Sequence, residues 1–342
     1  METKIWSVSA SQPEPEIIKQ AATLIRQGGL VAFPTETVYG LGADGLNPQA
    51  VEKIFKAKER PTDNPLILHV ADFATVGRLA RQVDERATKL ISAFWPGPLT
   101  LVLPKQKSIP NEVTAGLDTV AIRMPRHPVA LALIKASGTP LAAPSANRSG
   151  YPSPTTGQHV YTDLAGRIEA ILESGPTGVG LESTVLDLSG TVPVVWRPGG
   201  VSLEELTAIL GTVEMKTDLK YTHYAPRAEV VLLQGSTVKV AAKIKALVDD
   251  YSGQGKKIGL LLTAETWIEL GEMVEKSAVL YQQNLGSSSH LENIARIIYR
   301  ELRNCDLAGV EIILTETYQR KGLGVALMNR LLKSANGQVI NV

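Results

Sequence analysis

The sequence has a single cysteine, almost no net charge and no long apolar run, and each of these shortages excludes some classes of protein. Cys305 is the one cysteine among 342 residues, which excludes an intramolecular disulfide and any metal site built from several cysteines. Lysine plus arginine number 35 and aspartate plus glutamate 34, so no excess charge draws the chain onto nucleic acid or an anionic membrane. No apolar run approaches the ~20 residues that cross a bilayer, and the N-terminus lacks the pattern of a secretory signal. We therefore expect a soluble, cytoplasmic protein.

Common active-site motifs are also missing. There is no Gly-x-x-x-x-Gly-Lys-Ser/Thr loop for ATP, no His-Glu-x-x-His or paired-cysteine metal motif, and no Gly-x-Ser-x-Gly elbow. The run Gly322-Leu323-Gly324 lacks the spacing of a dinucleotide fingerprint. We therefore expect neither covalent catalysis nor a metal site built from protein side chains.

The composition and length favour two globular domains. Hydrophobic residues make up 44% and charged residues 20%, which is ordinary for a folded protein, and the length exceeds that of one typical domain. Residues 211–228 are short of aliphatic side chains, so we predict a linker there, between domains formed by residues 1–210 and 229–342. In the last domain strands alternate with helices, which predicts a doubly wound parallel sheet.

In the first domain, polar loops repeatedly adjoin apolar strands. They comprise residues 35–42, 58–64, 145–149, 180–184 and 197–200. Such loops gather at one edge of an open sheet and bind ligands there, so we expect a common site. Lys58, Arg60 and Arg197 suit a triphosphate because cations make strong, charge-assisted bonds to phosphate. Arg123, at the end of an apolar strand, suits a small carboxylate.

Taken one at a time, these residues also have simpler structural explanations. Lys58 and Arg60 fit the basic last turn of a helix that begins at Asn47 and Pro48. A histidine such as His69 is often structural. Likewise, Ser145 and Asn147 are common turn formers, and Arg123 would fit a surface ion pair.

Several motifs in order, however, resemble one known family. They are Pro34-Thr35-Glu36-Thr37-Val38-Tyr39-Gly40-Leu41, Lys58-Glu59-Arg60-Pro61, Phe94-Trp95-Pro96-Gly97-Pro98-Leu99-Thr100 and Ala143-Pro144-Ser145-Ala146-Asn147. The chain resembles the YrdC family over about Ile17 to Leu210. The runs Tyr221–Pro226 and Gly322–Arg330 are similar to the linker and tail of its long, two-domain form. The resemblance implies an α/β fold with an N-terminal twisted, open mixed sheet and a smaller C-terminal Rossmann-like domain.

The resemblance also implies site residues. The catalytic group around the nucleotide phosphates would be Lys58, Arg60, Ser145 and Asn147. Further ATP-binding residues would be Asn64, Thr119, Ser153, Arg197 and, closing over the ligands from the linker, Tyr224. L-Threonine would be bound by Thr37, with Thr35 a close second for the same role, and by His69, Arg123, the backbone of Ala143, and Ser183. Mg²⁺ would accompany ATP, held mainly by phosphate oxygens and water.

The activity implied is that of an L-threonylcarbamoyl-AMP synthase, a nucleotidyltransferase. Threonine, bicarbonate and ATP would give the adenylate and pyrophosphate, for threonylcarbamoyladenosine at tRNA position 37. A tRNA or tRNA-modification enzymes would then be further partners. One alternative is a non-catalytic module that binds double-stranded RNA or tRNA, and another is a different carbamoyl or nucleotidyl transferase.

Overall fold

The chain forms two compact units. The computed structural model describes residues 1–216, 225–271 and 278–342. One unit comprises Met1–Ser149 and Ser153–Leu219, and the other comprises Gly150–Pro152 and Lys220–Val342. Among the described helices, none is long and apolar enough to span a membrane.

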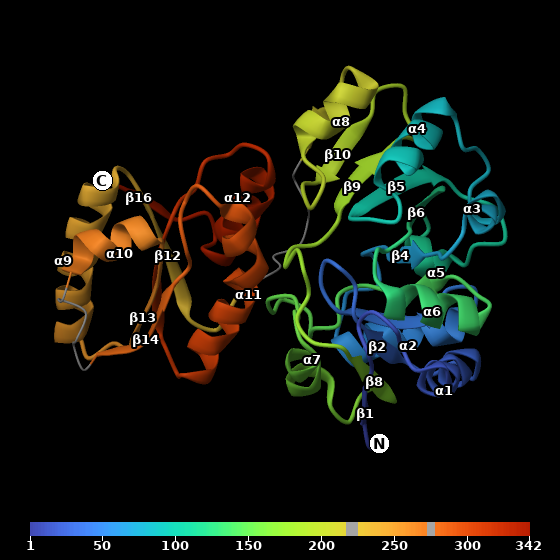
Figure 1. Ribbon diagram of the computed structural model, residues 1–342, viewed down its shortest axis with the longest axis horizontal. Coiled ribbons are helices and arrows are strands. Elements are labelled where there is room, and N and C mark those ends of the chain that lie inside the picture. The colour runs from blue at the N-terminus through green and yellow to red at the C-terminus, as the bar shows by residue number, and fades with distance from the viewer. Residues whose placement is uncertain (217–224, 272–277) are drawn as a thin grey trace. The chain divides into compact units, whose positions relative to one another are not determined.

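Within the described ranges, the first unit forms one eleven-stranded sheet (Figure 1). Its strands are β1 (Lys4–Ser7), β2 (Val31–Phe33), β3 (Gly40–Asp44), β4 (Ile67–His69), β5 (Leu99–Pro104), β6 (Thr119–Arg123), β7 (Leu141–Ala142), β8 (Ala170–Glu173), β9 (Thr184–Asp187), β10 (Val194–Arg197) and β11 (Glu214–Met215). They lie in the order β1-β8-β2-β3-β7-β4-β6-β5-β9-β10-β11. Parallel pairs such as β4–β6 alternate with antiparallel pairs such as β5–β6, which confirms the expected mixed sheet.

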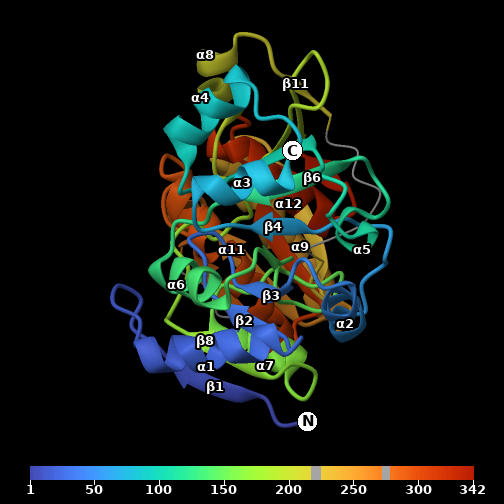
Figure 2. The same cartoon turned by 90° about the vertical axis from the view of Figure 1, so that its right-hand side faces the viewer.

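Helices pack on both faces of this sheet. They are α1 (Pro15–Arg26), α2 (Pro48–Lys58), α3 (Phe73–Leu79), α4 (Glu85–Phe94), α5 (Asn111–Thr114), α6 (Pro128–Ser137), α7 (Gly157–Leu164) and α8 (Leu203–Leu210). Successive strand residues point to opposite faces. Val31 and Phe33 therefore share a core with α1 and α6, which lie side by side (Figures 1 and 2). Ala32, between them, belongs to the larger core that α2 and α7 complete.

Helix ends follow local signals in the sequence. The side chain of Asn47 accepts two backbone N–H groups of the first turn of α2, and Pro48 is the first helical residue, as predicted. Gly28 follows α1 with φ of 75°, a left-handed conformation that glycine adopts without a steric penalty. Ser202 begins α8 in a reciprocal capping box with Glu205.

The predicted linker, residues 211–228, contains a short strand. Its strand β11 pairs in parallel with β10, and the Glu214 N–H donates to Pro193 O at 2.9 Å. The low aliphatic content gave no sign of this strand because the pairing rests on backbone hydrogen bonds. Residues 217–224 lie outside the described residues.

The second unit is a parallel α/β sheet. Its described strands are β12 (Glu229–Gln234), β13 (Ile258–Leu262), β14 (Val279–Asn284), β15 (Ile312–Glu316) and β16 (Val339–Asn341), and its helices are α9 (Thr237–Gly253), α10 (Ala264–Leu270), α11 (Leu291–Leu307) and α12 (Leu323–Ser334). The strand order is β14-β13-β15-β12-β16, and every pairing is parallel. Helices α9 and α10 lie on one face, α11 and α12 on the other (Figure 1). This confirms the predicted doubly wound sheet, whose strand β13 is buried throughout because helices cover both faces.

Candidate active site

Three of the predicted site residues, His69, Thr119 and Arg123, lie on one face of the neighbouring strands β4 and β6. In β6, Val120 and Ile122 belong to the larger apolar core. Thr119 and Arg123 alternate with them and therefore lie on the opposite face. The register pairs Arg123 with His69 of β4, which places His69 on this face too. Thr119 and Arg123 are four residue steps apart along the strand, a span of about 13 Å.

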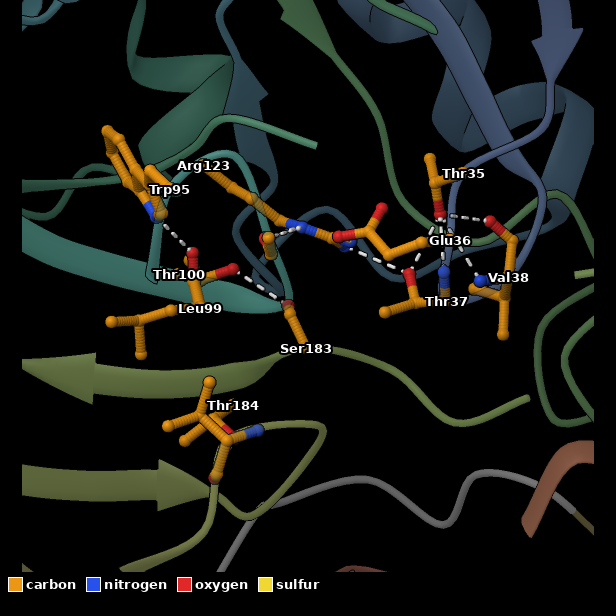
Figure 3. Close-up of polar contacts among 12 residues, drawn as sticks. Thr35, Glu36, Thr37, Val38, Trp95, Leu99, Thr100, Arg123, Ser183 and Thr184 are labelled. Carbon is orange, nitrogen blue, oxygen red and sulfur yellow. Dashed lines mark hydrogen bonds and ion pairs between the residues drawn. The ribbon is translucent and has the colours of Figure 1, made fainter. Parts of the chain in front are cut away.

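Arg123 is held at the end of β6 by three neighbours (Figure 3). Its Nη1 donates to Thr37 Oγ1 at 3.0 Å, and its Nε donates to Gly97 O at 3.2 Å. Its Nη2 lies 2.8 Å from Glu36 Oε1 in an ion pair. Both charged residues are buried, so the surface ion pair considered for Arg123 is wrong.

The loop between β2 and β3 presents Thr37 to Arg123. Thr35 Oγ1 donates to Val38 O at 2.6 Å and accepts the N–H groups of Thr37 and Val38, both at 3.2 Å. It also lies 2.8 Å from Thr37 Oγ1 (Figure 3). Thr35 therefore shapes the turn, as threonine hydroxyls do in such loops. Its neighbour Thr37 carries the hydroxyl that contacts the guanidinium.

His69 is a neutral, buried imidazole. Burial, reinforced by the positive charge of Arg123, lowers its pKa to about 3. Its Nδ1 lies 3.2 Å from Ile67 O, and the ring of Phe33 meets the imidazole edge-on at 6.2 Å between centroids. Donation from Nδ1 to that carbonyl leaves Nε2 as an acceptor.

Ser183, just before β9, is hydrogen-bonded to Thr100 of β5 and to Arg197 of β10. Its Oγ lies 2.8 Å from Thr100 Oγ1, and Arg197 donates from Nη2 to the same Oγ and from Nε to Ser183 O, both at 3.1 Å. A bulge between Val195 and Arg197 interrupts the β9–β10 register. Bulges change the direction of a side chain, which accounts for Arg197 reaching this face.

Lys58, Ser145 and Asn147 form a compact cluster. Lys58 ends α2 but is only 1% exposed, and its Nζ donates to Ser145 O at 2.5 Å and to Asn147 O. Ser145 Oγ donates to Asn147 Oδ1 at 2.5 Å. Lys58 is thus more than a solvent-facing cation at a helix end, because its charge is directed into the loop after β7.

Arg60 turns back onto its own loop. Its Nε and Nη2 donate to Asn64 O, each at 3.4 Å, and Nη2 also donates to Pro65 O at 3.3 Å. These bonds are long, and bonds of this length are weak. The structure therefore places Arg60 beside Asn64, and a phosphate could replace these contacts with shorter, charge-assisted bonds.

The remaining predicted residues occupy defined positions, with one exception. Ser153 Oγ donates to Glu182 Oε1 at 2.5 Å, and both residues are buried. The backbone N–H of Ala143 donates to Ile67 O at 2.9 Å, which ties it to β4. Tyr224 lies outside the described residues.

The predicted loops do not gather at one edge of the sheet. The loop of Lys58 precedes β4, whereas His69 and Arg123 end the parallel strands β4 and β6. Antiparallel β7 brings Ser145 to the starting end of β4, where the Lys58 loop lies. The expectation that all the loops meet at one edge of the sheet was wrong, because the sheet mixes parallel and antiparallel strands and so divides the loops between its two opposite edges. One face of the sheet runs between those edges.

Sequence reasoning gave no role to three buried polar residues. They are Glu36 beside Arg123, Thr100 beside Ser183, and Glu182 beside Ser153. Glu36 and Thr100 stand inside the motifs that carry the family resemblance. Glu36 is the one charged residue in the run of residues 34–41, and this could have marked it as a functional residue from the sequence.

Fold and site together define a two-domain α/β protein whose larger domain holds a lysine-centred loop cluster and a buried arginine at two ends of a sheet face. Residues 23–199 match the family model described as "Telomere recombination", and residues 201–336 match "Threonylcarbamoyl-AMP synthase, C-terminal domain". The chain therefore belongs to the threonylcarbamoyl-AMP synthase family, which confirms the resemblance.

Relatives match along the whole chain. A threonylcarbamoyl-AMP synthase of Pyrococcus abyssi is 46% identical over 95% of this chain and 96% of its own length. One of Bacillus subtilis is 45% identical over 99% and 100%, respectively. The crystal structure of P. abyssi Sua5 complexed with L-threonine has a TM-score of 0.93 and 45% identity, covering 99% of this chain and 100% of that chain. The roles assigned to individual residues stay predictions.

Proposed function

We propose that this chain is an L-threonylcarbamoyl-AMP synthase, which joins L-threonine, bicarbonate and ATP and releases pyrophosphate. The proposal rests on one observation: strand β6 places Thr119 and Arg123 on the same face, about 13 Å apart. Arg123 then binds the threonine carboxylate, while the Lys58 cluster binds the nucleotide phosphates. Relatives that span the whole chain carry this name, which favours an enzyme over the RNA-binding alternative.

The reaction needs alignment and charge neutralisation more than covalent help. The threonine ammonium first loses a proton, and the neutral amine then bonds to the carbon of bicarbonate as water leaves. A carbamate oxygen then bonds to the α-phosphorus of ATP as the bond from that phosphorus to pyrophosphate breaks. Lys58 and Arg60 stabilise negative charge on the phosphates, and Arg123 and Thr37 orient the amino acid.

Magnesium fits this site through the nucleotide. Among the described residues, no group of three or more His, Cys, Asp or Glu is placed to hold a metal ion. We therefore propose that phosphate oxygens and water hold Mg²⁺, which favours oxygen ligands and retains water readily. With ATP bound, the ion would neutralise phosphate charge alongside the two basic side chains.

The test measures pyrophosphate release from ATP and bicarbonate, with and without L-threonine. Release that depends on threonine, together with an adenylate of the expected mass, supports the proposal. Equal release without threonine, or release triggered by carbamoyl phosphate instead, would favour another transferase. RNA affinity with a steep salt dependence but no pyrophosphate release would favour the binding module. A cytoplasmic location and partners in tRNA modification stay predictions.

A further inference from the structure

Glu36 is a buried carboxylate beside Arg123, the last residue of strand β6. It is 7% exposed, and its Oε1 lies 2.8 Å from Arg123 Nη2. This close approach is an ion pair without hydrogen-bond alignment. Among the residues that the structure describes, neither carboxylate oxygen of Glu36 has a hydrogen-bond partner, and neither does Arg123 Nη2. Apart from this ion pair, the two residues thus have acceptor and donor capacity side by side that no described residue uses.

Buried groups of this kind are costly unless something completes their bonds. An ionised carboxylate has room for about four hydrogen bonds, and leaving a buried charged group without them costs stability. Burial lowers the pKa of His127, although the charge of Glu36 raises it, so burial disfavours the imidazolium that would pair with this carboxylate. The loop holds Glu36 in place because Val179 N–H donates to Glu36 O at 2.8 Å.

The Arg123 guanidinium and the Glu36 carboxylate lie side by side, so they are complementary to a ligand that carries a negative and a positive group close together. The carboxylate and ammonium of an α-amino acid are bonded to the same carbon and carry opposite charges. We propose that Glu36 binds the α-ammonium group of L-threonine while Arg123 binds its carboxylate. The inference rests on the proposed function and adds a specificity residue to it. Glu36 makes the site selective for a zwitterion over an acid without an amine.

The test compares three ligands that differ in these two groups. They are L-threonine, L-threoninol, which lacks the carboxylate, and the hydroxy acid in which OH replaces the α-ammonium. Affinities are measured by calorimetry, or by competition against threonine, for the wild type and for Glu36→Gln. This variant keeps the size of the side chain and removes its charge.

Glu36→Gln should weaken threonine and threoninol by roughly 10- to 100-fold, the loss expected for a hydrogen bond to a charged group. The hydroxy acid should stay within roughly twofold of its wild-type affinity, the change expected where no contact is lost. Equal weakening of all three ligands would show that Glu36 only shapes the loop around Arg123. Unchanged threonine affinity would also overturn the proposal.

Two further variants keep the test decisive. Glu316→Gln removes a carboxylate of similar burial, 8% exposed, in the second unit, and should leave all three affinities unchanged. The same selective loss in that variant would contradict the proposal. If Glu36→Gln fails to fold, Glu36→Asp keeps the charge but withdraws it by one methylene, and should show a smaller loss of the same selectivity. A uniform loss would overturn the idea.

The outcome is separable from that of the proposed function. Threonine-dependent pyrophosphate release by the wild type tests the activity, whereas ligand selectivity tests Glu36. An active wild type with an unselective Glu36→Gln effect would contradict only the role of Glu36. Selective threonine binding by an inactive wild type would contradict only the synthase activity.

Discussion

Replacing Lys58 by methionine tests whether its charge serves the loop or merely ends a helix. The substitution keeps the length of the side chain and removes its ammonium group. Ser145 O and Asn147 O then lose the donor that Lys58 supplies in the buried cluster. Each carbonyl left without a partner costs ~1–3 kcal/mol, while the burial cost of the ammonium disappears.

We expect a net loss of about 2 kcal/mol in the free energy of unfolding for Lys58→Met. At ~2–4 °C per kcal/mol for a unit of this size, the first unit should melt roughly 4–8 °C lower. Threonine-dependent pyrophosphate release should fall by about 100-fold or more, because a charge aimed at the phosphates is lost. Thermal denaturation and the pyrophosphate assay measure the two effects.

Lys56→Met is the matched control. Lys56 stands in the same last turn of α2 but is exposed, so its replacement should change stability by less than about 0.5 kcal/mol and leave turnover unchanged. If Lys58→Met and Lys56→Met behave alike in both assays, Lys58 is a helix-end cation and our reasoning about the cluster is refuted.

Three further predictions concern stability and reactivity. The pKa of His69 is lowered from 6.5 to about 3, so the unfolded chain takes up a proton before the native protein does, and the free energy of unfolding falls as the pH drops from 6.5 towards 3. His69→Gln should therefore lose less thermal stability than the wild type between melts at pH 7 and pH 5. An equal loss in the two proteins would contradict this. Asn47→Ala should cost ~0.5–2 kcal/mol in urea denaturation, whereas Ser236→Ala, at a helix start without a side-chain cap, should cost far less; similar costs would count against the cap. Cys305 is buried and its pKa is raised by burial, so a thiol reagent at neutral pH should label it only after unfolding, and rapid labelling of the native protein would disprove its inertness.

Local signals in the sequence were sufficient for many elements. Helix α2 begins at Asn47 because that side chain caps free N–H groups, and alternating strands and helices after Glu229 give a parallel sheet. These features depend on neighbours in the chain, and motif order identified the family. Burial of Lys58 was not predictable, because its partners Ser145 and Asn147 are more than eighty positions away.

By itself, the sequence determined the two-domain α/β class, the main helix caps and the family. Only the tertiary structure decided that the site follows a sheet face between two edges, since strand direction depends on pairing between distant segments. It also decided that Arg123 meets Glu36 and Thr37. That meeting depends on a loop after β2 folding over the end of β6, and no local pattern encodes the contact of residues so far apart in the chain.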